Sequence, residues 1–252
     1  MEAYRVSEEQ IRAEQENYKQ NYAPFRPFQF QPESGDKIAR LFANLITMQN
    51  GQDTDDYSVG DNNKVQRYMS HLPANSRVLI LGTGTGRETR TAISIGLDPV
   101  GTTLGSRNID FGIKYLNLAP DRHLEMLNED LAFAKESFDC IAGFQVFEHA
   151  IAPLAFLLEA GRVLKYNGEL ILEWPPADKF TMEENPHHQV CYDPGQAYAL
   201  FQKAGFKDIR VTYEDGSEIP SDKWWSGYHD KMLLIRGRKA ESTQEYINKA
   251  WS

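Results

Sequence analysis

The sequence predicts an α/β protein built on a doubly wound, mostly parallel sheet, and three observations support this fold class. From Arg77 onward, short apolar runs alternate with amphipathic stretches, which is the pattern of buried strands connected by helices. One such run, Val78–Leu81, leads directly into the alternating glycines of Gly82–Gly86. The length of 252 residues suits one α/β domain with an N-terminal extension better than two independent domains.

The strands are expected where short apolar runs rich in β-formers lie between turn-forming residues. Seven segments fit this description. They are Val78–Leu81, Pro99–Thr103, Glu125–Leu127, Cys140–Gln145, Glu169–Trp174, Asp208–Tyr213 and Met232–Arg236.

The region before the first strand has a different texture and is predicted to be a helical extension. Ser7–Gln10 resembles a helix-capping box. A second helix is indicated by apolar residues at helical spacing, namely Ile38, Leu41, Phe42 and Leu45. Gly51–Asn63 is rich in Asp, Gly and Asn, so we expect a loop and a candidate lid. The resulting domain boundaries are a helical extension or lid at 1–70, the sheet domain at 71–240 and a C-terminal tail at 241–252.

Composition and charge exclude several classes of partner. The chain carries 27 basic and 36 acidic residues, a net charge of −9, and has no dense basic run, so no nucleic-acid partner is expected. No apolar run approaches the roughly 20 residues of a membrane span, and no export signal is evident. Cys140 and Cys191 are the only cysteines, which favours a reduced, cytoplasmic protein without a disulfide framework. We expect a monomer or a homodimer.

The glycine-rich segment predicts a ligand site at the end of the first strand. Glycine lets the backbone approach a ligand where a Cβ atom would collide, and a helix N-terminus follows. A dinucleotide-binding loop would need G-x-G-x-x-G, but Arg87 stands at the third glycine position. A phosphate loop would need Lys-Ser/Thr after Gly86, where Arg87-Glu88-Thr89 stands. A tight turn without any ligand remains an alternative.

The strand and its glycines resemble motif I of the class I S-adenosylmethionine-dependent methyltransferases. The resemblance continues in Asp130-Leu131-Ala132-Phe133 with Ser137-Phe138-Asp139, in Phe144–His149, in Arg162–Leu170, and in His188–Pro194 with Lys203-Ala204-Gly205-Phe206. The last stretch is similar to type 11 and ubiquinone-biosynthesis methyltransferases. The resemblance implies a seven-stranded Rossmann-like sheet over residues 71–240. It also implies an enzyme that transfers the methyl group of S-adenosylmethionine to a small-molecule or displayed acceptor and releases S-adenosylhomocysteine.

The resemblance also implies which residues bind the cofactor. These are Gly82, Thr83, Gly84, Gly86, Thr103, Leu104, Asn128, Glu129 and Gln145. Three positions depart from the family pattern, because Ile80, Thr103 and Leu127 stand where the family normally has acidic residues. A carboxylate that binds ribose hydroxyls contributes about 1.5–3 kcal/mol, so its loss weakens binding without forbidding it. Glu88, or a residue of the extension, is a candidate replacement.

Histidines near the carboxyl ends of the predicted strands are the candidate catalytic residues. His149, His187 and His188 are candidate general bases, which slightly favours oxygen over nitrogen or carbon as the methyl acceptor. The alternative is that Glu148 and His149 orient the next helix. Glu148, His149, Glu173, His187 and His188 also offer metal-ligand atoms, but no spacing demands a metal and none is expected.

Two other functions remain open from sequence. A non-catalytic scaffold or regulatory protein of the same fold would explain the missing carboxylates, and another nucleotide-binding protein, such as an oxidoreductase, would explain the glycines alone. Trp174-Pro175-Pro176 and Trp224–His229 either line an apolar acceptor pocket or pack in the core. The Pro-Pro motif of amino-methylating nucleic-acid enzymes is replaced by Gln145-Val146-Phe147-Glu148, which argues against base methylation.

Overall fold

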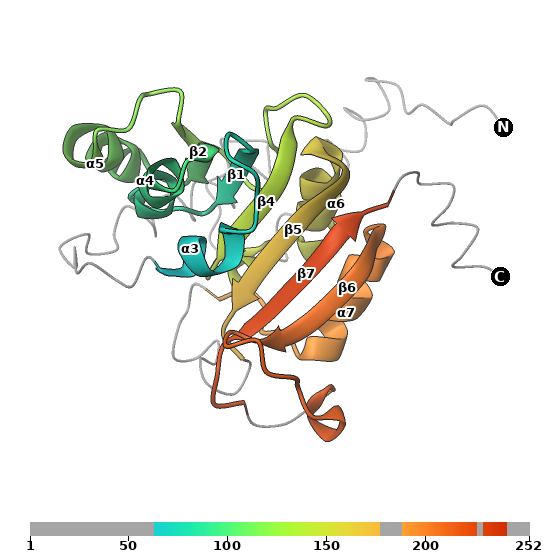
Figure 1. Cartoon of the computed structure of the whole chain (residues 1–252). Coiled ribbons are helices and arrows are strands. Elements are labelled where there is room, and N and C mark those ends of the chain that lie inside the picture. Colours follow the sequence, from blue (N-terminus) through green and yellow to red (C-terminus); the bar gives the residue numbers. More distant parts are fainter. Residues whose placement is uncertain (1–62, 177–187, 226–228, 241–252) are drawn as a thin grey trace, which may run out of the picture. The chain divides into compact units, whose positions relative to one another are not determined.

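A seven-stranded sheet organises the part of the chain described by the computed structural model, which comprises residues 63–176, 188–225 and 229–240 (Figure 1). The strand order is β3-β2-β1-β4-β5-β7-β6. The strands are β1 (Arg77–Leu81), β2 (Asp98–Thr103), β3 (His123–Glu125), β4 (Phe138–Phe144), β5 (Leu164–Trp174), β6 (Phe206–Tyr213) and β7 (Leu233–Lys239).

The predicted strands and the mostly parallel sheet are confirmed. Pairs β1·β2, β2·β3, β1·β4 and β4·β5 are parallel, whereas β7 lies between β5 and β6 and is antiparallel to both. The third strand occupies His123–Glu125 instead of the expected Glu125–Leu127. Leu127 forms an isolated bridge with Asp130 just after it.

Helices cover both faces of the sheet, as a doubly wound fold requires. Because successive strand residues point to opposite faces, β1 contributes to two cores. Leu79 and Leu81 lie in the core that contains α6 (Pro153–Val163) and α7 (Pro194–Lys203). Val78 and Ile80 lie in the core that contains α3 (Asn63–Met69) and α4 (Arg87–Ser94). The remaining α-helix of the described residues, α5 (Ser106–Leu116), packs on β3.

The sheet topology places the carboxyl ends of the five parallel strands, β1 to β5, at one edge. The chain runs from β1 outward to β2 and β3, and then returns to β4 on the other side of β1. In open α/β sheets, ligands bind outside the carboxyl edge at such a reversal. The loop Gly82–Gly86 and the short 3-10 turn η2 (Phe147–His149) follow β1 and β4 at this edge.

The predicted lid and tail fall largely outside the described residues, which exclude 1–62 and 241–252. The end of the predicted extension is α3, which packs on the sheet through Val65, Tyr68 and Met69. None of the helices in the described ranges is long and apolar enough to cross a membrane.

We expect Asp193→Ala to destabilise the domain through α7. The Asp193 side chain accepts the backbone N–H of Gln196, and the Gln196 side chain accepts the N–H of Asp193 at 3.1 Å, which forms a capping box. Loss of the cap should cost about 1 kcal/mol, which lowers the melting temperature by roughly 2–4 °C. Thermal unfolding checks this, with Asp222→Ala in the exposed 3-10 turn η3 (Ser221–Lys223) as control. Equal melting temperatures for the two variants would contradict the role of the cap.

Candidate functional site

The glycine loop between β1 and α4 adopts a backbone that side chains disfavour. Gly82, Gly84 and Gly86 have φ angles of +62°, +52° and +92°. A Cβ atom at Gly82 would collide with Val146, which follows β4, and one at Gly86 would collide with Leu118. These two glycines are therefore required by the packing of the protein itself.

Gly84 differs from its two neighbours in the loop. A Cβ atom built on Gly84 would meet no atom of the described chain within 4 Å. Its hydrogen therefore faces space that no described residue occupies, so a ligand can approach the backbone there. The site prediction for Gly84 thus has a geometric basis that the sequence alone did not supply.

Thr83 fastens the loop to its surroundings. Its backbone N–H donates to Thr102 O at 2.8 Å, and its hydroxyl donates to Glu88 Oε2 at 3.1 Å. Burial raises the pKa of the Glu88 carboxyl, while the bond from Thr83 opposes that rise. Glu88, considered above as a replacement acceptor, therefore lies against the glycine loop.

The predicted cofactor residues after β2 and β3 lie at the same sheet edge. Thr103 is buried, and its hydroxyl accepts from Asn108 Nδ2 at 3.5 Å, while Leu104 follows it. Asn128 Oδ1 accepts from the Thr102 hydroxyl at 3.2 Å.

One carboxylate near Thr103 was missed from sequence. Glu125 is the register partner of Thr103, and its Oε1 accepts the N–H of Gly105 at 3.0 Å. Parallel pairing of the two predicted strands was the only signal that could have indicated it.

Glu129 has a structural task in addition to its predicted place beside the cofactor. Its Oε1 accepts the backbone N–H groups of Ile151 and Ala152, at 2.8 and 3.3 Å, at the start of α6. Because the N-cap residue Ala152 has no side-chain cap to offer, Glu129 fixes the two residues that lead into α6. The helix-orienting role considered for Glu148 and His149 therefore belongs at least partly to Glu129.

Glu173, at the end of β5, is buried and satisfied by three side chains. Lys64 forms an ion pair with it, Tyr68 donates at 3.0 Å, and Gln145 Nε2 donates at 3.3 Å. Burial and the Glu173 charge raise the pKa of Tyr68. Gln145 has a φ angle of +56°, and its backbone N–H donates to Glu173 O at 2.9 Å. The predicted cofactor residue Gln145 is thus held in place by Glu173.

Glu148, His149 and His188 converge at the same edge. One potential ligand atom from each lies within 4.8 Å of the others. Glu148 is 1% exposed, and burial, with a smaller effect of the Glu173 charge, raises its pKa to about 8. The sequence offered all three as candidates but could not show that His188 reaches the end of β4. His187 lies outside the described residues.

Trp174 and Trp224, which the sequence left as either pocket-lining or core residues, lie in different parts of the domain. Trp174 is fully buried and donates from Nε1 to Tyr192 O at 3.0 Å, so it is a core residue. Trp224 packs edge-on against Tyr198 of α7, and the backbone N–H of Gly195 donates to Trp224 O at 2.8 Å. Both observations favour packing over an acceptor pocket for these residues.

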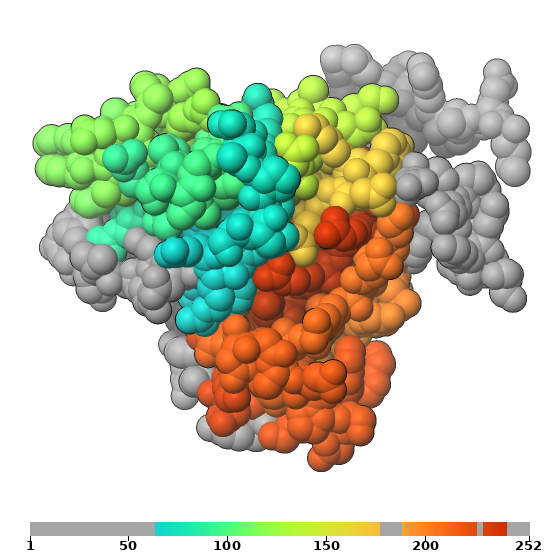
Figure 2. Space-filling view, in the orientation of Figure 1, coloured from blue at the N-terminus to red at the C-terminus, as the bar shows by residue number. Residues whose placement is uncertain are grey.

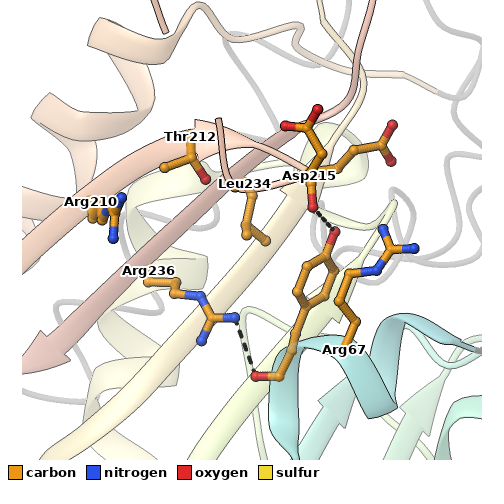
Figure 3. A pocket seen from close by; sticks show the side chains of 9 residues that line it. Arg67, Arg210, Thr212, Asp215, Leu234 and Arg236 are labelled. Carbon is orange, nitrogen blue, oxygen red and sulfur yellow. Dashed lines mark hydrogen bonds between the residues drawn. The ribbon is translucent and has the colours of Figure 1, made fainter. Parts of the chain in front are cut away.

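A cavity of about 230 Å³ opens away from the glycine loop, between α3 and the β6–β7 pair (Figures 2 and 3). In Figure 2, α3 (cyan) borders the orange and red atoms of these strands. Figure 3 shows Arg67, Arg210 and Arg236 around it, with Asp215 at its rim. Arg236 donates to Tyr68 O at 3.3 Å and to Glu169 Oε1 at 3.2 Å. None of the predicted cofactor or catalytic residues that the structure describes lines this cavity.

Comparison with known proteins finds methyltransferases of similar sequence and fold. Residues 79–172 match the family model described as a methyltransferase domain. These residues are thus similar to the class I S-adenosylmethionine-dependent methyltransferases whose motifs the sequence resembles. The matched region runs from β1 to β5 and so includes the glycine loop, η2 and the Glu148–His149 pair.

Two curated relatives and one solved structure illustrate the similarity. An uncharacterized protein of Methanocaldococcus jannaschii is 27% identical over 168 residues, which are 62% of this chain and 76% of that protein. A ubiquinone biosynthesis O-methyltransferase of Cereibacter sphaeroides is 31% identical over 113 residues, 44% of this chain and 42% of the enzyme. The fold is shared with phosphoethanolamine N-methyltransferase 2 of Haemonchus contortus, solved with S-adenosyl-L-methionine, at a TM-score of 0.57 and 15% identity, over 71% of this chain and 52% of that one.

We expect Gly84→Ala to weaken cofactor binding without unfolding the protein, because its Cβ atom would point into the space left for the ligand. Calorimetric titration with S-adenosylhomocysteine should show at least a tenfold loss of affinity, about 1.4 kcal/mol. Gly96→Ala is the matched control, because Gly96 also has a positive φ, +84°, and open space around its missing Cβ. If both variants bind like the parent chain, the ligand does not pass Gly84.

Proposed function

We propose that the chain transfers the methyl group of S-adenosylmethionine to an oxygen atom of a small-molecule or displayed acceptor. The convergence of Glu148, His149 and His188 at the cofactor edge supports this proposal most directly. Methyl transfer from a sulfonium needs alignment of nucleophile, methyl carbon and sulfur, and a hydroxyl acceptor must also lose a proton. In this proposal His149 and His188 assist the loss of that proton.

In this proposal the glycine loop would hold the cofactor, with Gly84 in contact with it. Thr103, Leu104 and the backbone of Asn128 and Glu129 would hold the adenosine, and Gln145 would contact the methionine end. This arrangement is supported by the shared sheet edge, at which β1, β2, β3 and β4 all terminate. In this proposal Glu88, which is bonded to Thr83 of the loop, and Glu125, the register partner of Thr103, replace the carboxylates absent at Ile80 and Thr103. Ile80 itself is fully buried in the α3–α4 core.

Packing couples the cofactor loop to the catalytic cluster. Val146 contacts the position of Gly82 from the β4 side, and it directly precedes η2, which carries Glu148 and His149. A nucleophile held by the cluster therefore lies on the β4 side of the cofactor loop.

We expect His149→Ala to lower turnover while cofactor binding is retained. Removal of a group that assists proton loss should slow methyl transfer by about 10²–10⁴-fold, with an unchanged dissociation constant for S-adenosylhomocysteine. Transfer of radiolabelled methyl groups to a panel of hydroxylated acceptors measures this. His71→Ala is the control, because His71 pairs with Glu169 at 2.8 Å, away from the cluster. Methylation only at nitrogen or carbon, or equal turnover in His149→Ala, would contradict the proposal.

A further inference from the structure

The cluster of Glu148, His149 and His188 combines two segments that are distant in sequence. Glu148 and His149 belong to η2 after β4, whereas His188 precedes α7. Their potential ligand atoms lie within 4.8 Å of one another, and the two imidazole rings are 5.1 Å apart at an interplanar angle of 67°. Each residue thus offers one potential metal-ligand atom to the same small region.

Backbone bonds fix the two segments against each other. The carbonyl of Glu148 accepts the N–H groups of Gln189 and Val190, at 2.8 and 3.2 Å. Phe147 stacks on Tyr192 with ring centroids 4.5 Å apart. These contacts join Phe147 and Glu148 to residues that closely follow His188. The fold itself therefore brings the three side chains together.

The carboxyl group of Glu148 is buried without a hydrogen-bond partner, which indicates that it binds a ligand. Both of its carboxylate oxygens are buried, and neither has a hydrogen-bond partner among the described residues. An unpaired buried carboxyl group is costly whether ionised or protonated. Glu173 at the same edge is also buried, but it is satisfied by Lys64, Tyr68 and Gln145. The contrast singles out Glu148 as the carboxylate that awaits a ligand.

The set of donor atoms selects a class of ion. Two imidazole nitrogens and one carboxylate oxygen suit Zn²⁺ and other divalent first-row transition metals, whereas Mg²⁺ and Ca²⁺ favour oxygen ligands. Metal bonds of about 2.0–2.2 Å place neighbouring ligand atoms roughly 3–3.5 Å apart. The present separations of up to 4.8 Å therefore require small side-chain rotations, of the kind that long or aromatic side chains make readily. Three protein ligands also leave coordination positions open.

We propose that Glu148, His149 and His188 bind a divalent transition-metal ion, and that an acceptor hydroxyl oxygen occupies an open coordination position. The second part rests on the proposed methyl transfer to oxygen. A bound metal lowers the pKa of a coordinated hydroxyl, so the histidines act as metal ligands instead of direct bases. The hydroxyl proton passes to solvent, the oxygen–carbon bond forms as the carbon–sulfur bond breaks, and S-adenosylhomocysteine leaves.

The test is titration of the full, untagged, chelator-treated chain with Co²⁺, followed by visible absorption and by metal analysis. We expect one Co²⁺ ion per chain, displaced by Zn²⁺. Glu148→Gln and His188→Ala should each weaken binding at least about tenfold, since each loses one of three ligands. His71→Ala is the control, because His71 pairs with Glu169 but belongs to no group of three potential metal ligands within the described part of the chain. Circular dichroism establishes that each variant is folded.

Titration of the same metal-free samples with S-adenosylhomocysteine separates this proposal from the proposed function. If the parent chain binds S-adenosylhomocysteine but not Co²⁺, or if Glu148→Gln and His188→Ala bind Co²⁺ like the parent, the metal site is overturned and methyl transfer stands. If Co²⁺ binds as expected and S-adenosylhomocysteine does not, the metal site stands and the proposed function fails. If neither binds, both are overturned.

Discussion

The close packing between the glycine loop and the residue after β4 is the constraint on which the site depends. Gly82 has no room for a side chain because Val146 occupies that space. The contact joins the carboxyl ends of β1 and β4, the two central strands at which the chain reverses direction across the sheet. It therefore sets where the loop presents Gly84 and where η2 presents Glu148 and His149.

Two buried carboxyl groups at this edge, those of Glu148 and Glu173, differ in how they are hydrogen-bonded. Glu173 is neutralised by Lys64 and hydrogen-bonded by Tyr68, which attaches α3 to the sheet by polar as well as apolar contacts. Glu148 has no such partner in the described chain, and burial raises its pKa to about 8. A carboxyl group that is destabilised when ionised gains the most from a cation or a proton-donating ligand. The unsatisfied carboxyl group of Glu148 thus lies where the chemistry is proposed.

Much of the fold followed from the sequence because apolar runs mark buried strands clearly. The start of β5 did not, since Asn167-Gly168 resembles a turn, yet the strand begins at Leu164. Pairing of Leu164 with Phe138 of β4, with a register shift before Cys140, carries the strand through that signal. The antiparallel position of β7 between β5 and β6 likewise depends on tertiary pairing, which no local pattern records.

The candidate site was predictable in part for a similar reason. Glycine spacing identified the loop, but only the structure separates Gly84, which faces open space, from Gly82 and Gly86, which are packed against the protein. The approach of His188 to Glu148 depends on backbone bonds between distant segments, so spacing along the chain could not reveal it. The carboxylate of Glu129 is used for α6, a competing task that the sequence did not indicate.

The central claim is that one sheet edge holds both the methyl donor and the groups that prepare the acceptor. A crystal structure of the full chain with S-adenosylhomocysteine tests it most directly. We expect the ligand to lie along Gly82–Gly86, in van der Waals contact with Gly84, and its sulfur to lie on the side of Glu148 and His149. A ligand bound instead in the arginine-lined cavity between α3 and the β6–β7 pair would contradict the claim.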